Sequence, residues 1–254
     1  MSEVYNFPKY YEVAFSFRDI AREVDVFEEC FRQFSKIPVR SVLEIACGNS
    51  PHMEELVKRG YQYNGLDINE AMIAYSREKA QAFPERVNLV RADLVNFELD
   101  TKVDFVFTLL DSIFVKNSGE LQSHFDRVAD VLRKGGLYFL DWCVHFEIAT
   151  FEDAVSWEME QNNIRVKTTV QWQAISRSEQ TFRETITFEV DDRGNKNKIT
   201  GSIIKRAVYP QEFLFFIDRQ QHFEFVGWWN NWNLKKPLKD QIKIDRPIAV
   251  VRRI

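Results

Sequence analysis

Acidic and small residues follow several short apolar runs of the sequence, where they could hold a ligand. The first run passes into residues 44–50, Glu-Ile-Ala-Cys-Gly-Asn-Ser, whose small side chains let the backbone approach a ligand closely. Asp67 ends the next run, 21 residues after Ala46, which is the spacing of a carboxylate that binds ribose hydroxyls. Asp93 and Asp111 follow two more runs, and a carboxylate such as Asp93 accepts a hydrogen bond from an adenine amino group.

The loop at residues 46–51 lacks the glycine patterns of two common nucleotide sites. It reads Ala-Cys-Gly-Asn-Ser-Pro, so only the middle glycine of a dinucleotide G-x-G-x-x-G loop, Gly48, is present. It also lacks the Gly-Lys-Ser/Thr ending that cradles nucleotide phosphates. The sequence therefore favours an adenosine ligand without phosphates and disfavours an NAD(P) oxidoreductase.

Between residues 39 and 141, short apolar runs alternate with amphipathic stretches. We expect strands at Val39–Ile45, Tyr61–Leu66, Val87–Val90, Val103–Leu110 and Gly136–Asp141. We expect helices at Arg18–Phe34, at Pro51–Gly60, after the cap Asn69, and from Ser118 to a stop at Gly135. This alternation predicts an α/β fold, a Rossmann-like, doubly wound, mostly parallel sheet. Ligands bind beyond the carboxyl ends of such strands, where the acidic segments stand.

A different pattern begins near residue 155. Apolar and polar residues alternate over Ile164–Ala174 and Phe182–Val190, and more weakly over Ile199–Tyr209, with a turn at residues 191–195. This period of two predicts an inserted antiparallel β meander at residues 155–208, within a single domain of residues 1–254. A helix from Pro210 and strands at His222–Trp229 and Pro247–Arg252 complete a seven-stranded sheet.

The composition is that of a globular protein of a reducing compartment. The 254 residues carry 34 Lys and Arg against 38 Asp and Glu, a net charge of −4, and 45% are hydrophobic. No apolar run is long enough for a membrane helix, and no secretory signal opens the chain. The three cysteines lack CxxC spacing, which argues against structural zinc. We expect a cytoplasmic protein without a metal.

At this point the chain resembles the class I S-adenosylmethionine-dependent methyltransferases, of the small-molecule type with an antiparallel β insertion. The matching segments are Val42–Ser50, Gly65–Met72, Ala92–Leu94 and Val131–Gly136, in the family's order and spacing. The likeness runs over about residues 38–142 and returns weakly at 209–212 and 247–253. Ala46 and Ser50 stand where the family usually has glycine.

The resemblance implies S-adenosylmethionine as cofactor, S-adenosylhomocysteine as product, and a role for each matching residue. The loop backbone at Ala46 and Gly48 would meet the methionine part, and Glu44 would support its amino group. Asp67 would bind both ribose hydroxyls. The full set of expected cofactor residues is Tyr11, Glu44, Ala46, Gly48, Asp67, Ile68, Asp93, Leu94 and Leu109.

Each acidic residue also has an ordinary structural explanation. An aspartate just after a strand often caps a helix or forms a turn, which would suffice for Asp67 and Asp93 separately. Their joint placement at neighbouring strand ends favours a ligand site. Glu44 is harder to explain, because a charge inside a buried strand is unfavourable without a partner.

Methyl transfer from a sulfonium needs alignment more than acid catalysis, and a base helps only if the acceptor must lose a proton. The candidates near the expected site are Asp111, His145, Asp141 and Glu147, of which we predict Asp111 and His145 to be catalytic. Both also have structural explanations, as a turn cap and as a hydrogen-bonded core histidine. Aromatic residues expected at the mouth are Tyr10, Tyr11, Trp142, Phe146 and Trp172, with Tyr11 on a lid-like N-terminal segment.

The substrate class follows by elimination. Residues 111–114 read Asp-Ser-Ile-Phe and not the Asp/Asn-Pro-Pro-aromatic motif of amino-methylating DNA enzymes, and the negative net charge disfavours nucleic acid. The basic residues Lys196, Lys198, Lys205 and Arg206 are interpreted as a solvated hairpin. We therefore expect N- or O-methylation of a small molecule, with neither nucleic acid nor membrane as partner, and a homodimer formed through the insertion. A non-catalytic adenosine-binding or scaffold protein remains the alternative.

Overall fold

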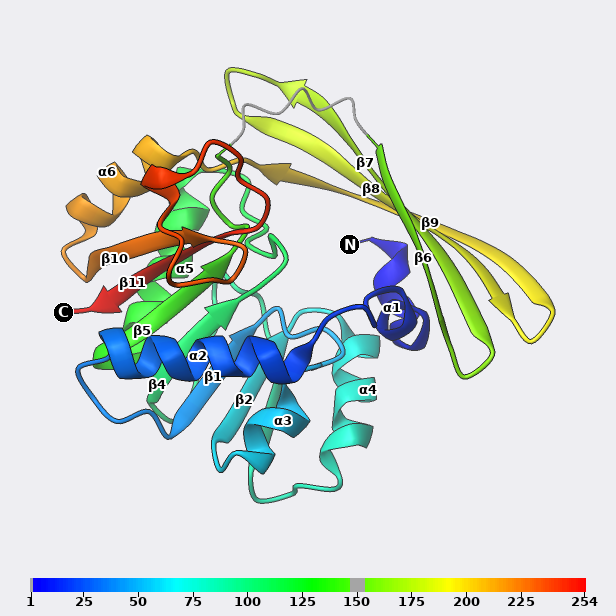
Figure 1. Cartoon of the computed structure of the whole chain (residues 1–254), viewed down its shortest axis with the longest axis horizontal. Helices are drawn as coiled ribbons and strands as arrows, with labels where there is room; N and C mark the ends of the chain where they lie inside the picture. Colours follow the sequence, from blue (N-terminus) through cyan, green and yellow to red (C-terminus); the bar gives the residue numbers. More distant parts are fainter. Residues whose placement is uncertain (1, 147–153) are drawn as a thin grey trace.

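The computed structural model describes residues 2–146 and 154–254, which form a seven-stranded and a four-stranded sheet (Figure 1). The large sheet has the order β10-β11-β5-β4-β1-β2-β3. Its strands are β1 (Ser41–Ile45), β2 (Gln62–Asp67), β3 (Val87–Arg91), β4 (Val103–Thr108), β5 (Leu132–Asp141), β10 (Phe223–Asn230) and β11 (Pro247–Arg253). The pairs among β1 to β5 are parallel, and β11 is antiparallel to both neighbours. The predicted mostly parallel seven-stranded sheet is confirmed.

Helices cover both faces of this sheet. In Figure 1, α2 crosses the near face and α5 lies behind the strands. The helices are α1 (Pro8–Ala14), α2 (Ile20–Phe34), α3 (Met53–Lys58), α4 (Glu70–Ala80), α5 (Ser118–Val131) and α6 (Pro210–Gln220), with short 3-10 turns η1 (Glu3–Asn6) and η2 (Leu238–Asp240). Asn69 caps α4 as predicted, since its side chain accepts a hydrogen bond from the Met72 amide.

Strand β4 shows how the two faces are packed, because all six of its residues are buried. Phe105 and Phe107 face α2, where the Phe27 ring lies 5.1 and 4.9 Å from theirs. Val106 points to the other face, into the core that includes Phe125 of α5. Each such buried side chain contributes roughly 1.5–3 kcal/mol of apolar burial. The sheet is thereby held rigidly, and its carboxyl edge is a stable platform.

The helix that was expected to stop at Gly135 ends earlier. Helix α5 finishes at Val131 and β5 begins at Leu132, so that prediction is wrong. Leu132 pairs with Val103 of β4, and the register then shifts before Phe105. The apolar period of the helix continues to Leu132, but pairing with the neighbouring strand draws this residue into the sheet. Gly135 lies within β5 and supplies a φ of 87° there.

The inserted sheet has four antiparallel strands, one more than the apolar runs predicted. They are β6 (Ala154–Gln161), β7 (Ile164–Ser176), β8 (Thr181–Asp192) and β9 (Asn195–Arg206). The N-terminal segment packs on its inner face, with Val4 and Val13 in one core with Phe188. The approach is so close that a Cβ at Gly201 would overlap Ser2 Oγ and the Glu3 amide. In the part of the chain described here, no helix is long and apolar enough to cross a membrane.

Candidate active site

The loop after β1 has an unusual backbone. Ala46, Gly48 and Ser50 all have positive φ, at 55°, 52° and 48°. Residues other than glycine rarely adopt this conformation, because the Cβ crowds the carbonyl oxygen. A Cβ at Gly48 would meet only Met72 Sδ, at 4.0 Å, so the space beside this residue is open. The loop turns its backbone toward room for a ligand, as its small residues predict.

Asp67 is fixed beside this loop at the end of β2. Its Oδ2 accepts a hydrogen bond from the Gly48 amide and its Oδ1 one from the Asn69 amide, both at 2.8 Å. Burial raises the pKa of Asp67 although these amide donors oppose the shift. Each carboxylate oxygen keeps a further lone pair, so the group can still accept hydrogen bonds from a diol. The next residue, Ile68, is 43% exposed and presents an apolar surface beside it.

The remaining expected cofactor residues differ in exposure. Asp93 is exposed, and its Oδ1 accepts a hydrogen bond from the Val95 amide at 3.0 Å, the ordinary role of an aspartate that forms a turn. Leu94 and Leu109 are buried after β3 and β4. Asp93 and Leu94 thus follow the edge strand β3, whereas Leu109 follows β4, which β1 and β2 separate from β3.

Glu44 is buried inside β1 and both of its oxygens have protein partners. Oε2 accepts a 2.6 Å hydrogen bond from the Tyr63 hydroxyl, and Oε1 lies 3.1 Å from Nδ1 of His52. The other imidazole nitrogen of His52 lies 2.8 Å from Glu23 of α2. Burial would lower the pKa of His52, but these carboxylates raise it above its ordinary value. The imidazolium thus compensates the buried charge of Glu44.

Arg246 extends this network of charges from Glu23 to the end of β5. It pairs with Glu23 at 3.0 Å and with Asp141, at the end of β5, at 2.7 Å. Burial would raise the pKa of Glu23, but its hydrogen bond with His52 and the charge of Arg18 hold it well below its ordinary value. A chain of buried charges therefore links the loop after β1 to the carboxyl end of β5.

Asp141 is a structural residue and not the base that its position suggested. It is fully buried, and Trp232 Nε1 and Arg246 both donate to it. Its Oδ2 accepts a hydrogen bond from the Leu110 amide, and its carbonyl oxygen accepts one from the Asp111 amide, both at 3.1 Å. Leu110 and Asp111 have φ of 54° and 55°, so Asp141 holds a strained turn in place. Glu147, the fourth candidate, lies outside the described residues.

This turn places Asp111 against the inserted sheet. Its Oδ2 lies 2.6 Å from Nζ of Lys205 on β9, and that ammonium lies 3.4 Å from Glu184 on β8. Trp172 of β7 donates its indole N–H to Glu184 at 3.0 Å. Burial would raise the pKa of Asp111, but Lys205 and His145 hold it below its ordinary value. The carboxylate of Asp111 is thereby kept ionised.

His145 and Asp111, the two predicted catalytic residues, lie together. Nε2 of His145 is 3.5 Å from Oδ2 of Asp111, and the imidazole packs edge-on against Phe182 of β8. Within the part of the chain that the structure describes, the buried Nδ1 of His145 has no hydrogen-bond partner. A buried acceptor or donor without a partner is unfavourable by about 1–3 kcal/mol, which a bound ligand could relieve.

Two tyrosines of the N-terminal segment are within reach of charges from both the parallel sheet and the inserted sheet. The Tyr5 and Tyr11 rings are 5.8 Å apart, and Tyr11 stacks on Phe15 at 4.5 Å. The pKa of Tyr5 is raised first by burial and then by nearby Tyr11, Glu184 and Asp67. Carboxylates from both sides therefore act on the same hydroxyl group.

A family model described as a methyltransferase domain matches part of the parallel sheet, over residues 42–136. Residues 42–136 are therefore similar to a methyltransferase domain. A dTDP-3-amino-3,4,6-trideoxy-alpha-D-glucopyranose N,N-dimethyltransferase of Streptomyces venezuelae is 27% identical over 126 residues. That match covers 49% of this chain and 51% of the relative, so the chain matches about half the length of its curated relatives.

Solved structures extend the likeness beyond the methyltransferase domain. An S-adenosylmethionine-dependent methyltransferase from Clostridium acetobutylicum superposes with a TM-score of 0.77 at 17% identity, over 96% of both chains. Streptomyces venezuelae DesVI has a TM-score of 0.74 at 18% identity, over 93% of this chain and 92% of its own. These likenesses show a shared fold, so the predicted class I methyltransferase architecture is confirmed.

Sequence reasoning missed two residues that meet the methyltransferase domain. The interpretation of Lys205 as part of a solvated hairpin is wrong, because its side chain is 2% exposed and paired with Asp111. Arg206 is also largely covered and pairs with Glu212, while Lys196 and Lys198 are exposed as expected. Glu184 had a signal that went unused, since it occupies an inward position in the alternating run Phe182–Val190.

The expected aromatic cluster is only partly assembled. Trp172 contacts Glu184, and the charges of Glu184, Asp67 and Glu44 act on Tyr11. Trp142, however, is 42% exposed and donates to the Asp245 carbonyl, and Phe146 packs edge-on against Trp228. The positive φ of Trp142, 61°, turns its side chain away after β5. These two are not placed with Tyr11 and Trp172.

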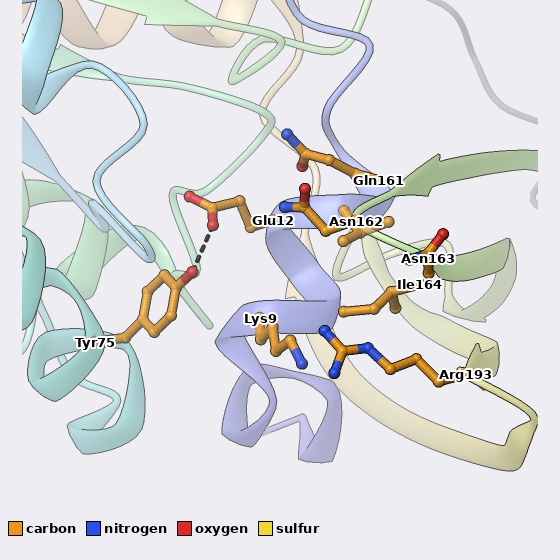
Figure 2. Close-up of a pocket in the computed structure, with 9 residues that line it drawn as sticks. Lys9, Glu12, Tyr75, Gln161, Asn162, Asn163, Ile164 and Arg193 are labelled. Atoms are coloured by element: carbon orange, nitrogen blue, oxygen red, sulfur yellow. Dashed lines mark hydrogen bonds between the residues drawn. The ribbon is translucent and has the colours of Figure 1, made fainter.

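A polar cleft of about 560 Å³ lies between α1, α4 and two hairpin turns of the inserted sheet (Figure 2). Tyr75 of α4 donates a 2.5 Å hydrogen bond to Glu12 on one side, and Lys9 and Arg193 lie on the other. None of the residues predicted to bind cofactor or to act in catalysis lines this cleft. It is separate from the site described above.

Proposed function

We propose that this protein transfers a methyl group from S-adenosylmethionine to a small-molecule acceptor and releases S-adenosylhomocysteine. The observation that carries the proposal is the geometry at Asp67. Its carboxylate is fixed by the Gly48 amide at 2.8 Å, beside an open space that continues the loop after β1. The match of residues 42–136 to a methyltransferase domain model supports this assignment.

The residues at this edge suit the parts of the cofactor. Asp67 would accept hydrogen bonds from the two ribose hydroxyls, and the exposed face of Ile68 would pack against adenine. Asp93 would accept from the adenine amino group, next to Leu94. The backbone of Ala46 and Gly48 would hold the methionine part, with Glu44 behind the loop, Leu109 at the end of β4, and Tyr11 covering the site from the N-terminal segment.

When bound, the cofactor supplies an electrophilic methyl group on a sulfonium sulfur. The protein's contribution is alignment, which can lower the barrier by roughly 7–11 kcal/mol. Asp111 and His145 would bind the acceptor, since they lie together after β4 and β5, which are neighbouring strands. His145 Nδ1, which has no partner, is the candidate atom to accept a proton from an acceptor that must lose one.

The proposal also covers the methyl acceptor, the domain organisation, the oligomeric state and the location of the protein. We propose N- or O-methylation of a small molecule, by a single domain whose insertion spans residues 155–208. The relative from Streptomyces venezuelae is named for N,N-dimethylation of an amino sugar, which supports a small acceptor. We also propose a homodimer formed through the inserted sheet, checked by gel filtration, and a cytoplasmic location, which the three buried free cysteines favour.

Calorimetric titration with S-adenosylmethionine, S-adenosylhomocysteine and NAD tests the function. We expect both sulfur ligands to bind, and Asp67→Asn to weaken binding by about tenfold or more. Asp100→Asn, an exposed aspartate of the same domain, is the matched control and should bind as the parent protein does. Binding of NAD alone would indicate an oxidoreductase instead. Binding of the sulfur ligands without turnover on any acceptor in a broad panel would favour the scaffold alternative.

A further inference from the structure

The insertion supplies a cluster of charges that the proposed methyl transfer does not itself require. Lys205 Nζ lies between Oδ2 of Asp111, at 2.6 Å, and Oε2 and Oε1 of Glu184, at 3.4 and 3.5 Å. Three residues from three strand regions thus meet where the insertion faces the methyltransferase domain. Two carboxylates against one ammonium leave the cluster with a net charge of −1.

The Lys205 side chain is buried and paired within this cluster. Its side chain is 2% exposed, and its ammonium also lies 4.8 Å from the centre of the Phe114 ring. Burial would lower the pKa of Lys205, but Asp111 and Glu184 raise it. The ammonium therefore keeps its proton and does not act as a base. Its closer contact is with Asp111, which leaves Glu184 as the less compensated carboxylate.

The cluster has acceptor atoms that remain open. Lys205 and His145 both contact Asp111 at Oδ2, and the Asp111 side chain is 19% exposed. Glu184 is held by Trp172 and, at longer range, by Lys205. Among the described residues, the buried His145 Nδ1 has no partner. A surface of acceptors with a net negative charge complements a group that carries several N–H donors and a positive charge.

Charges of both this surface and the proposed cofactor site act on two tyrosines. Beyond the larger effect of burial, Glu184, Asp111 and Asp67 all raise the pKa of Tyr5, and Glu184 and Asp67 raise that of Tyr11. The rings of Tyr5 and Tyr11 are 5.8 Å apart. Aromatic faces attract ammonium groups, which adds to the preference for a cation.

We propose that Glu184 and Asp111, with Lys205 as the residue that positions them, bind the methyl acceptor through a primary or secondary amine. This inference rests on the function proposed above and narrows it from N- or O-methylation to N-methylation. Glu184 accepts a hydrogen bond from the ammonium form on entry, and Oδ1 of Asp111 accepts one from the reacting nitrogen.

The chemistry favours an amine over a hydroxyl group. The amine first gives a proton to His145, its lone pair forms the new N–C bond as the C–S bond breaks, and the electron pair of that bond leaves with sulfur as a neutral thioether. Positive charge develops on nitrogen during this step, where the fixed carboxylates of Asp111 and Glu184 stabilise it. A hydroxyl group would instead have to develop negative charge on oxygen, which the nearby carboxylates of Asp111 and Glu184 disfavour.

The Trp172 indole N–H, which donates to Glu184, is a built-in reporter of this subsite. Its ¹⁵N–¹H signal, assigned with Trp172→Phe, is followed while n-butylamine or n-butanol is added to protein saturated with S-adenosylhomocysteine. We expect the amine to shift the signal in a saturable way and the alcohol to leave it in place. Glu184→Gln should weaken the amine's binding by about tenfold or more.

Matched controls distinguish a failure of this inference from a failure of the proposed methyl transfer. Glu189→Gln changes an exposed glutamate of the same strand and should bind the amine as the parent protein does. Equal responses to amine and alcohol, no response to either, or unchanged amine binding by Glu184→Gln would each overturn the amine subsite. If the protein does not bind S-adenosylhomocysteine at all, the proposed methyl transfer itself fails, which the calorimetric titration detects separately.

Discussion

Lys205 Nζ lies 2.6 Å from Oδ2 of Asp111, and this contact joins the inserted sheet to the carboxyl edge of the parallel sheet. Asp111 is held from the other side as well, because Asp141 fixes the strained turn at Leu110 and Asp111. Its carboxylate is therefore set by two distant segments at once. Such double support is what a preorganised group in an active site needs.

Lys205→Met should destabilise the protein strongly. The substitution leaves Asp111 partly buried beside Glu184 without the cation that compensates them, and we expect the free energy of unfolding to fall by about 3 kcal/mol. Urea denaturation at pH 7 measures this loss. Lys198→Met, at an exposed position of the same strand, should change stability by less than about 0.5 kcal/mol.

The double variant Lys205→Met, Asp111→Leu tests whether the loss comes from this pair. Removing both charges should lose less stability than the two single variants added together, because the charge of Asp111 is no longer left without its cation. Additive losses would mean that the two residues act independently.

The buried His52 predicts a pH dependence of stability on the alkaline side. Because the pKa of His52 is raised in the folded protein, its contribution is complete below the unfolded value of about 6.5. It is lost as the pH rises from there through the folded pKa. Burial lowers the pKa of His124 to about 4 and raises the pKa values of the three cysteines, so these groups also change protonation on unfolding between pH 6 and 9. The effect of His52 is therefore measured as a difference from a His52 variant.

His52→Gln is the comparison for that prediction. The variant should be less stable than the parent protein at pH 6, and its stability should change less between pH 6 and 9. A parallel decline of both proteins would assign the pH dependence to other groups.

Gly201→Ala should weaken the docking of the N-terminal segment. The added Cβ would overlap Ser2 Oγ and the Glu3 amide, and such overpacking is unfavourable by about 1–3 kcal/mol. Limited proteolysis followed by mass spectrometry should show earlier cleavage before residue 15. Ser202→Ala, on the exposed face of the same strand, should be cleaved as the parent protein is.

Trp232→Phe should destabilise the turn that carries Asp111. The indole N–H of Trp232 donates to the buried Asp141 at 2.9 Å, and a hydrogen bond to a charged group contributes about 1.5–3 kcal/mol. Trp142→Phe removes a comparable N–H that serves an exposed carbonyl, and should lose less. Equal losses in thermal unfolding would show that Asp141 does not depend on Trp232.

Local patterns were enough to predict most elements of the fold. The cap Asn69, the buried strand Val103–Thr108 and the helix that begins at Pro210 follow from turn chemistry and apolar period, and the structure has all three. The boundary at Leu132 did not follow, because its side chain suits either a helix or a strand. Pairing with Val103 of β4 decides between them.

For the site, the sequence by itself determined that acidic residues stand at or just after the ends of strands, since the spacing of apolar residues predicts the order of strands and turns. Asp67, Asp93 and Asp111 were found in this way. Only the tertiary structure decided what faces them. Lys205 and Glu184 belong to a sheet that folds back over that edge, and the partner of a charge depends on contacts between segments far apart in the chain. A lysine in a sequence looks the same whether water or a carboxylate surrounds it.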